Sequence, residues 1–578
     1  MQRPIHGGVL RSISSSLFNK TRSLFAHPKR NRHARRRYRK LYGDHQVQPL
    51  EPRVLLSATL GGDAWYDLNN NAINDAGDVA VGAGIVVNLL DSGGTQLDTT
   101  VTNASGQYSF ADIAAGDYRI EFVSPSSNFV FVTQDAGSDT LDSDADVTTG
   151  RTAVITLADS DVLDDVDAGF SALSVYVDDD WSGVADGDDP DGVGAATIFG
   201  VDAFANIQDA IDHLTTGGTI YVADGTYDEN LFINKDLTLL SENGRDTTFI
   251  NGISGVGALG AIRVTNTTTA VQIGDIDQGF SILGVDNGNA VVENAAIYLQ
   301  GAHSGLSIIG NEIIADGDHG LLSEYGHAIT NALIDHNIFS GKTFTGANPA
   351  GEGFGAQFSL ANVPRQLVSI SGGASSSNDN ITFSNNQITG QAGGLNASND
   401  EQGNTLVTID AQNSIITDNT FEGTTTRFGS ALRVRGTTAT SITGNTFDTT
   451  NMGENTTQLF TQITSVNGLT GNDMSQVVAD NNFDTGTYIE GVGAVYTGMK
   501  NIIEAATSGS VIHILPGTYD EDLIVDNDIT IKGTFDLDGT LTLTDGTSLA
   551  PGSSPGIMNT GSIVMGLGTT LEIEIDGN

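Results

Sequence analysis

A short motif recurs down the second half of this 578-residue chain: an Asn that stands two residues before a large apolar side chain. Its copies are centred on Asn311, Asn337, Asn386, Asn419, Asn445 and Asn481. The steps between them are 26, 49, 33, 26 and 36 residues, and self-similarity at roughly 20–50 residues is typical of a solenoid. The intervening Ile, Val, Thr, Gly and Asn favour strands and turns. The sequence therefore predicts a coiled stack of short parallel strands.

In such a stack, the repeated Asn is expected to serve structure rather than binding. Asn tolerates left-handed turn conformations, and stacked amides can hydrogen-bond from one coil to the next. Function is then expected on the outer surface of the stack.

Charge divides the chain into two unequal parts. Residues 1–57 hold 13 Lys or Arg and two acids, whereas the other 521 residues hold 12 Lys or Arg and 69 acids. An acidic body of this kind repels nucleic acid and anionic membranes and attracts divalent cations. We therefore expect no nucleic-acid partner, and Ca²⁺ as the cofactor. Cysteine is absent, which excludes disulfides and thiolate metal sites.

The N-terminal segment, residues 1–60, combines a basic run at 29–40 with the sequence Leu50-Glu51-Pro52-Arg53-Val54-Leu55-Leu56-Ser57-Ala58. The second part resembles the LEPR-XLL motif found near the start of very large bacterial envelope and extracellular proteins, a resemblance that implies export. A basic arm that binds nucleic acid is the alternative. No apolar run approaches the roughly 18 residues of a membrane span.

Residues 61–170 predict a small all-β domain, because strand-like runs alternate with Gly- and Asn-rich turns every 8–12 residues. The order Trp65-Tyr66-Asp67, an acidic loop, Gly84-Ile85-Val86-Val87 and Gly116-Asp117-Tyr118 resembles the B-type domain of serine–aspartate-repeat surface adhesins. That resemblance implies an immunoglobulin-like β-sandwich stiffened by Ca²⁺.

The acidic loop of this domain has the spacing of a twelve-residue Ca²⁺ site. Side-chain oxygens fall at positions 1, 3, 5, 9 and 12, and position 7 offers a carbonyl, as a hard cation requires. The predicted ligands are Asp67, Asn69, Asn71, Ile73, Asp75 and Asp78. Ala72 stands where such loops usually carry Gly, and the last ligand is the short Asp78 rather than Glu. A solvated acidic turn is the alternative, and a dockerin would need a second loop and two helices.

A second acidic segment supplies further candidate metal ligands. They are Asp139, Asp142, Asp144 and Asp146. Alternating acids place carboxylates on one side of an extended segment, and the adhesin-domain resemblance also implies Ca²⁺ there. A solvated loop is again the alternative. The less regular acids of the linker, residues 171–200, are a weaker candidate of the same kind.

The solenoid is expected over residues 201–494 and opens with a short helix at 206–214, which has apolar residues at i, i+3, i+4 and i+7. A strand at 219–222, a turn at Gly225-Thr226-Tyr227 and further strands follow. This order resembles the opening coil of pectin-lyase-like right-handed parallel β-helices, in which the helix would cover the end of the stack.

The same opening recurs 292 residues later, where Gly517-Thr518-Tyr519 repeats Gly225-Thr226-Tyr227. Residues 495–578 therefore predict the start of a second β-helix, with one long solenoid containing an internal duplication as the alternative. The segment 547–556 resembles a turn of autotransporter-like passengers, and the chain ends in strand-like sequence without a cap, as in a fragment of a longer protein.

Catalysis is the competing hypothesis, since many pectin-lyase-like helices are polysaccharide lyases or hydrolases. Candidate side chains are His319, His327, Asp335, His336, Lys342, Arg433 and Arg435. Arg433 and Arg435 would share one face of a strand, where a lyase could use such an Arg as a base or to neutralise charge. The alternative is two outward arginines that pair with acids of neighbouring coils. No acid triad or metal-plus-base pattern accompanies them, so no catalytic residue is assigned, and fold resemblance alone does not make an enzyme.

Together these features predict an all-β protein, an immunoglobulin-like β-sandwich followed by one or two right-handed parallel β-helices. The predicted function is a secreted or cell-surface structural or adhesive protein with Ca²⁺ as cofactor. Its expected partners are extracellular polysaccharide or cell-envelope components, and the competing function is a lyase or hydrolase of acidic polysaccharide.

Overall fold

A computed structural model describes residues 57–265, 268–287, 293–341, 366–371, 377–392, 405–425, 430–436, 440–448, 457–462, 465–470, 473–526, 528–544, 546–550 and 557–572. The chain divides into two units, residues 1–55 and 56–578, and the described residues belong to the second. The basic run at 29–40, nearly all of the LEPR-XLL-like segment, Lys342, residues 551–556 of the autotransporter-like turn and the last residues of the chain lie outside them.

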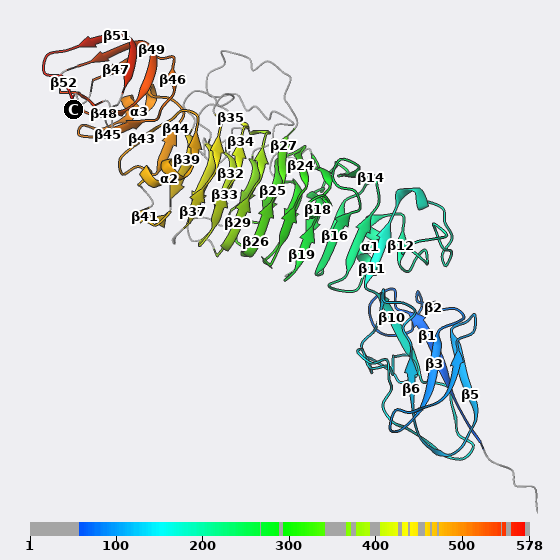
Figure 1. The fold of residues 1–578 in the computed structure, drawn as a ribbon. Coiled ribbons are helices and arrows are strands. Elements are labelled where there is room, and N and C mark those ends of the chain that lie inside the picture. The colour runs from blue at the N-terminus through cyan, green and yellow to red at the C-terminus, as the bar shows by residue number, and fades with distance from the viewer. Residues whose placement is uncertain are drawn as a thin grey trace, which may run out of the picture. The chain divides into compact units, whose positions relative to one another are not determined.

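The first domain is a sandwich of two sheets (Figure 1). One sheet contains β1 (Ala58–Tyr66), β2 (Val79–Ala80), β5 (Gln107–Ile113), β7 (Phe129–Phe131), β9 (Val162–Leu163) and β10 (Ala168–Ala172). The other contains β3 (Val86–Asp91), β4 (Gln96–Val101), β6 (Gly116–Phe122) and β8 (Ile155–Leu157). Alternation along β5 and β6 turns Tyr108, Phe110, Ile120 and Phe122 into the core, as expected for half-buried strands.

From Ser174 onward the chain coils, and three sheets built mainly from parallel strands run along the stack (Figure 1). The first contains β11 (Ser174–Val177), β12 (Ala203–Phe204), β13 (Thr219–Val222), β16 (Leu237–Ser241), β19 (Val271–Ile273), β22 (His303–Ser304), β23 (Ser307–Ile309), β26 (Ile329–Asp335), β29 (Asp379–Ser384), β33 (Ile415–Thr417) and β37 (Ser441–Thr443). The second contains β14 (Gly225–Asp228), β17 (Thr248–Asn251), β20 (Ser281–Leu283), β24 (Glu312–Ala315), β27 (Ile338–Gly341), β30 (Gln387–Ile388), β34 (Thr420–Phe421), β38 (Thr446–Phe447) and β42 (Asn482–Phe483).

The third sheet continues across the whole solenoid region. It contains β15 (Leu231–Ile233), β18 (Gly260–Val264), β21 (Ala295–Leu299), β25 (His319–Ser323), β28 (Gln366–Ile370), β32 (Thr405–Asp410), β36 (Ser430–Arg435), β39 (Thr457–Gln462), β44 (Ala494–Tyr496), β43 (Thr487–Ile489), β45 (Val511–Ile514), β48 (Thr530–Gly533), β50 (Ser548–Ala550) and β52 (Thr570–Leu571). Successive turns of the first solenoid add parallel strands to all three sheets, which confirms the predicted parallel β-helix.

The remaining elements are short. They are β31 (Gln391–Ala392) with β35 (Thr424–Thr425), β40 (Ser465–Val466) with β41 (Leu469–Thr470), a final sheet of β46 (Thr518–Tyr519), β47 (Leu523–Val525), β49 (Phe535–Leu543) and β51 (Met558–Met565), a 3₁₀ turn at Asp179–Trp181, and the helices α1 (Ile207–His213), α2 (Ser475–Asp480) and α3 (Lys500–Ala505).

The repeated Asn forms a buried ladder, as predicted. At each step the side-chain oxygen of one Asn accepts hydrogen bonds from the backbone and side-chain N–H of the Asn one coil earlier. Asn386 thus donates to Asn419 Oδ1 at 2.9 and 3.0 Å. The left-handed conformation falls one residue earlier than expected, at His336 and Asp418 for example. The ladder Asn itself is free to turn its amide inward.

The strand order separates two solenoids. β39 pairs antiparallel with β44, and β43 pairs antiparallel with β45, so the parallel run of the third sheet is interrupted there. Parallel pairing resumes from β45 to β48, and a separate apolar core forms around these strands. The second opening therefore starts a new coil stack.

Both solenoids open with the same arrangement. The prediction of a turn at its Gly-Thr-Tyr segment is wrong. Gly225–Asp228 is the strand β14, because Tyr227 points inward and is 2% exposed. Its hydroxyl donates to the Ala223 carbonyl at 3.2 Å, and Tyr519 donates to the Leu515 carbonyl at 2.9 Å. The buried ring and its satisfied hydroxyl favour an extended backbone over a turn.

Candidate functional site

The acidic loop after β1 closes on itself through its first and last carboxylates. The Asp67 oxygens accept the backbone N–H of Asn71 at 3.2 Å and of Ala72 at 2.7 Å. Asp78 Oδ1 accepts the backbone N–H of Leu68 at 3.0 Å. Burial is the largest influence on Asp67 and raises its pKa.

The side chains between them converge on Asp75. Asn69 Nδ2 donates to Asp75 Oδ1 at 3.1 Å, and Asn71 Nδ2 donates to Asp75 Oδ2 at 2.8 Å. Ala72 has a φ of 61°, the left-handed region that Gly usually provides in such loops. The backbone at this position is therefore left-handed although Ala replaces Gly.

The second acidic segment lies against this loop. Ile73 and Asp142 form an isolated antiparallel bridge, and the Asn74 N–H donates to the Leu141 carbonyl at 2.7 Å. Asp142 is 3% exposed; its Oδ2 accepts the Gly137 N–H at 2.7 Å. Its Oδ1 is buried and has no hydrogen-bond donor among the described residues. Two segments separated by some 70 residues in sequence therefore meet in the folded sandwich.

A cavity of about 200 Å³ beside this segment is lined by Asp135, Asp139, Asp144 and Asp165. Burial raises the pKa of Asp144 to about 7, and repulsion from Asp139 and Asp142 adds to the effect. Carboxylates crowded in this way are stabilised in their ionised form by a divalent cation.

Asp167 belongs to the same acidic group, although the sequence analysis did not predict it. Its N–H donates to Asp144 Oδ2 at 2.7 Å, and its own Oδ1 accepts the Asp63 N–H at 2.7 Å. Burial raises the pKa of Asp167 to about 8, and repulsion from Asp63 and Asp144 adds to the effect. The hydrogen bond from the Asp63 N–H lowers this pKa but offsets the rise only in part. The acid-rich run at 164–167 was the available signal, but its spacing gives no hint of the partner segment.

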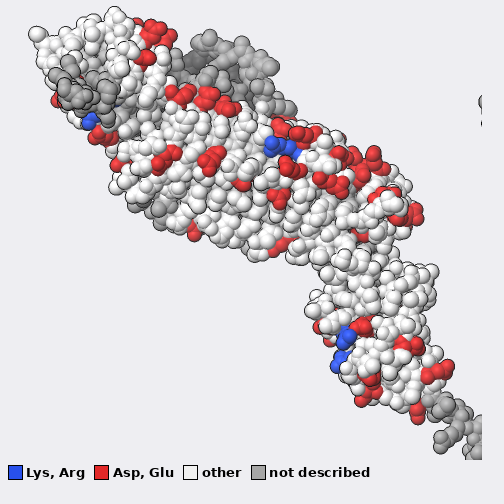
Figure 2. Space-filling view, viewed as in Figure 1, with Lys and Arg blue, Asp and Glu red and all other residues white. Residues whose placement is uncertain are grey.

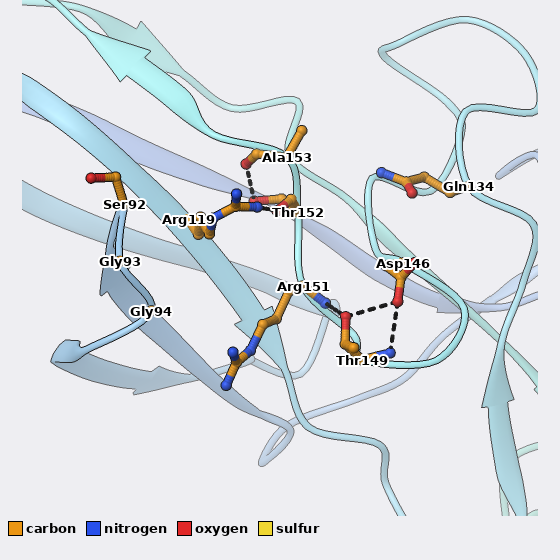
Figure 3. A pocket seen from close by; sticks show the side chains of 10 residues that line it. All are labelled: Ser92, Gly93, Gly94, Arg119, Gln134, Asp146, Thr149, Arg151, Thr152 and Ala153. Atoms are coloured by element: carbon orange, nitrogen blue, oxygen red, sulfur yellow. Dashed lines mark hydrogen bonds between the residues drawn. The ribbon is translucent and has the colours of Figure 1, made fainter.

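Asp146 lies apart from the other predicted ligands. Its Oδ1 accepts three hydrogen bonds from Thr148 and Thr149, which hold the pKa of Asp146 below its usual value. It lines a second, larger cavity (Figure 3).

In the part of the chain that the structure describes, no three His, Asp or Glu side chains are already arranged as a metal centre. The predicted calcium ligands also include Asn side-chain oxygens and a backbone carbonyl. In this structure their carboxylates accept hydrogen bonds from backbone N–H groups. The less regular linker acids mostly cap local turns: Asp178 Oδ1 accepts the Asp180 N–H at 2.9 Å.

Among the candidates for polysaccharide chemistry, Arg435 is held by a neighbouring coil. It lies opposite Asp410 in the register of β32 and β36, and its Nε donates to Asp410 Oδ1 at 2.6 Å. Arg433 lies opposite Thr408 on the same strand. Arg435 therefore pairs with an acid of a neighbouring coil, which was the alternative to a catalytic role.

The other candidates do not gather around these arginines. His319 is 3% exposed on β25 of the third sheet, three strands from β36, or about 14 Å at the usual strand spacing. Asp335 ends β26 of the first sheet, where its Oδ2 contacts His336 Nδ1 at 2.7 Å. His327 contacts Glu324 at 3.4 Å. The described side chains thus form several local pairs on two sheets.

Residues 58–170 match the family model described as the SdrD B-like domain. Over 118 residues, 20% of this chain, the sequence is 37% identical to serine-aspartate repeat-containing protein D of Staphylococcus aureus strain Newman. It is 39% identical over the same length to serine-aspartate repeat-containing protein C of strain N315. The match spans 8% and 12% of those two relatives.

Similar solved structures include the pectin methylesterase from carrot and pectin methylesterase PemA from Erwinia chrysanthemi. The first is 11% identical with a TM-score of 0.25, covering 51% of this chain and 83% of that structure. The second is 13% identical with a TM-score of 0.26, covering 54% and 92%. The solenoid assignment rests on the strand pairing described above. Within the described residues, no helix combines the length and apolar character that crossing a membrane requires.

Proposed function

We propose that this chain is a secreted or cell-surface structural and adhesive protein whose SdrD B-like domain is stabilised by Ca²⁺. The Sdr relatives of that domain support a location at the cell surface. The sandwich would serve as a stiffened module, and the solenoid flanks, rich in Thr, Asn and Ser, would contact polysaccharide or other cell-envelope components weakly and at many points.

The observation that carries the calcium part is the meeting of the two acidic segments. Asp67, Asp75 and Asp78 close the first loop, and the Ile73–Asp142 bridge brings the second segment beside it. A hard cation takes six to eight oxygens, and the two segments together offer carboxylates, amides and carbonyls. Asp142 Oδ1, buried and without a hydrogen-bond donor among the residues that the structure describes, and the raised pKa of Asp144 both fit a cation site.

Thermal unfolding of the full chain with Ca²⁺ and with a chelator tests this proposal. A ligand that binds the folded state at 100 times its dissociation constant adds about 2.7 kcal/mol to stability. We expect Ca²⁺ to raise the melting temperature of the sandwich by several degrees, and Asp67→Asn and Asp144→Asn to reduce that rise.

Asp98→Asn is the matched control, because Asp98 is an exposed acid on β4 of the opposite sheet. It should leave the calcium response unchanged. A melting curve that is identical in Ca²⁺ and chelator would remove calcium from the proposal, and an equal loss in all three variants would reduce the effect to general charge screening.

The location is tested separately by fractionating the source cells and probing each fraction with an antibody to the sandwich. We expect the signal in the envelope or the medium. A signal confined to the cytoplasmic fraction would contradict the surface role whatever the metal response.

A further inference from the structure

The sandwich carries only two basic residues, Arg119 and Arg151, against 19 acids in residues 57–172. Both arginines line one cavity of about 550 Å³, within the roughly 300–1,000 Å³ of small-molecule sites. Figure 2 shows blue atoms in one place over the sandwich, with red around them. All the positive charge of an acidic domain is therefore concentrated at one cavity.

The cavity walls come from parts of the sandwich that are far apart in the sequence. Arg119 lies on β6, beside Leu90 of β3 in the strand register. The turn Ser92-Gly93-Gly94 follows β3, and Arg151 follows the turn after Asp146 (Figure 3). A Cβ added at Gly94 would lie 3.5 Å from Arg151 Nη1, so the small turn leaves the guanidinium accessible.

The two guanidinium groups have different roles. Arg151 is held in place by Glu121, with Nε donating at 2.7 Å. Arg119 Nη1 donates to the Thr152 carbonyl at 2.6 Å, and among the described residues no carboxylate forms an ion pair with Arg119. Of the five N–H donors of a guanidinium, most on Arg119 therefore stay available.

The rest of the lining is polar. Besides Asp146, it includes Ser92, Gln134, Thr149 and Thr152, and Ala153 is its apolar member apart from glycine. Asp146 is occupied by three donors from Thr148 and Thr149. Hydroxyl and amide groups around an arginine suit a hydroxylated ligand that carries one carboxylate.

We propose that this cavity binds the carboxylate of an acidic sugar at the end of a glycan, with Arg119 as the anion contact. The surplus of acids over the domain repels a densely charged polyanion, whereas a single carboxylate on an otherwise neutral sugar meets mainly the nearby arginines. The proposal rests on the adhesive function above and gives it a ligand class, but it does not depend on calcium.

The test is saturation-transfer NMR and calorimetry of the full chain with methyl β-D-glucuronide, and with methyl β-D-glucoside as the matched neutral probe. We expect saturable glucuronide binding, at roughly millimolar affinity, that weakens with added salt. Glucoside should bind at least tenfold more weakly. Equal binding of the two sugars, or no saturable glucuronide binding, would overturn the proposal.

Variants locate the site. Arg119→Gln should lower glucuronide affinity at least tenfold, whereas Arg263→Gln, on β18 of the solenoid, should leave it unchanged. Because Arg119 also bonds the buried Thr152, Ser92→Asp serves as a second variant: it adds a negative charge at an exposed turn position and should weaken binding while the melting temperature is kept. Loss of binding in Arg263→Gln alone would place the site on the solenoid.

A peptide with a free C-terminal carboxylate is the competing ligand. If an acetylated dipeptide acid bound more tightly than the glucuronide, and its amide did not bind, the sugar assignment would be wrong. A calcium-dependent melting temperature together with no glucuronide binding would leave the proposed function standing and remove only this site.

Discussion

At the level of single residues, the buried amide ladder shows how one side chain can hold three coils together. Asn419 is 0% exposed; its oxygen accepts two hydrogen bonds from Asn386, and its Nδ2 donates to the Phe383 carbonyl at 2.8 Å and to Asn445 Oδ1 at 2.9 Å. Every donor and acceptor of the amide is used. Removing it leaves buried partners on both sides unsatisfied, and each costs about 1–3 kcal/mol.

Asn419→Ala should therefore lower the stability of the first solenoid by about 2–4 kcal/mol, measured by chemical denaturation followed by circular dichroism. Asn243→Ala is the control, since Asn243 is exposed and its side chain donates a hydrogen bond to Oδ1 of the exposed Asp224 at 3.0 Å. Its effect should stay within about 0.5 kcal/mol. Equal effects of the two variants would show that the ladder adds nothing beyond a surface hydrogen bond.

Asp167 gives the metal-free sandwich an unusual pH dependence. Its pKa is about 8 in the folded state, but about 4 in an unfolded chain. The folded state thus binds more protons between these values, and stability falls as pH rises through this window. In chelator, the melting temperature should decline from pH 5 to pH 8.

Asp167→Asn should flatten that decline, because the amide oxygen can still accept the Asp63 N–H but no longer ionises. The measurement is scanning calorimetry across the pH range, with Asp98→Asn for comparison. With Ca²⁺ present the trend should reverse, since the metal binds ionised carboxylates. An unchanged slope in Asp167→Asn would assign the pH effect elsewhere.

At the level of elements, the solenoid is held by stacked strands of matching side chains. Phe421, Phe447 and Phe483 lie on β34, β38 and β42, with ring centroids 4.8 and 4.6 Å apart and planes within 3°. The parallel register places like residues above one another. Such a stack buries large apolar surface in each coil.

Phe447→Ala should cost about 3–5 kcal/mol, because it opens a cavity in the middle of this stack. Thermal melting of the first solenoid measures the loss. Phe249→Ala on β17 is the matched control, since Phe249 is 37% exposed, and it should cost far less. A small effect at Phe447 would mean that the neighbouring rings collapse into the space.

The opening helices are held by the same device in both solenoids. Glu229 accepts the backbone N–H of Ile207 at 2.8 Å, and Glu521 accepts that of Met499 at 3.1 Å. Each Glu stands two residues after the buried Tyr of its Gly-Thr-Tyr motif. The carboxylate satisfies N–H groups that the helix start leaves unpaired.

At the level of the whole molecule, the described residues form two separate apolar cores. The smaller core lies between Met499 and Leu549, and the larger contains apolar residues of the sandwich and of the first solenoid, Phe421 and Phe447 among them. Because coils contact mainly their neighbours, solenoid stability is local. On the face drawn in Figure 2, Asp and Glu are spread along the solenoid and Lys and Arg are few.

Calorimetry of the full chain should therefore resolve a separate transition for the second solenoid. Leu541→Ala, at 0% exposure in the smaller core, should destabilise that transition by about 2–5 kcal/mol. The transition that Phe447→Ala affects should not move. A single transition lowered equally by both variants would show that the cores unfold as one unit.

Much of the fold could be predicted from residue spacing. The Asn repeat predicted the parallel stack, and the i, i+3, i+4, i+7 pattern predicted the helix that is α1. The Gly-Thr-Tyr segment was mistaken for a turn, because Gly and Thr favour turns locally while burial of Tyr227 decides the backbone. Asp167 was missed because its importance depends on a hydrogen bond to Asp144, which no sequence spacing encodes.

The sequence by itself determined the periodic parts of this protein: the coil repeat, the twelve-residue acidic loop and the concentration of acid after residue 57. Periodicity and composition act between near neighbours, so they can be followed along the chain. Only the tertiary structure decided that Ile73 meets Asp142, that the two arginines of the sandwich line one cavity, and that an antiparallel switch separates two solenoids. These depend on packing between distant segments, where burial and strand register select among many local options.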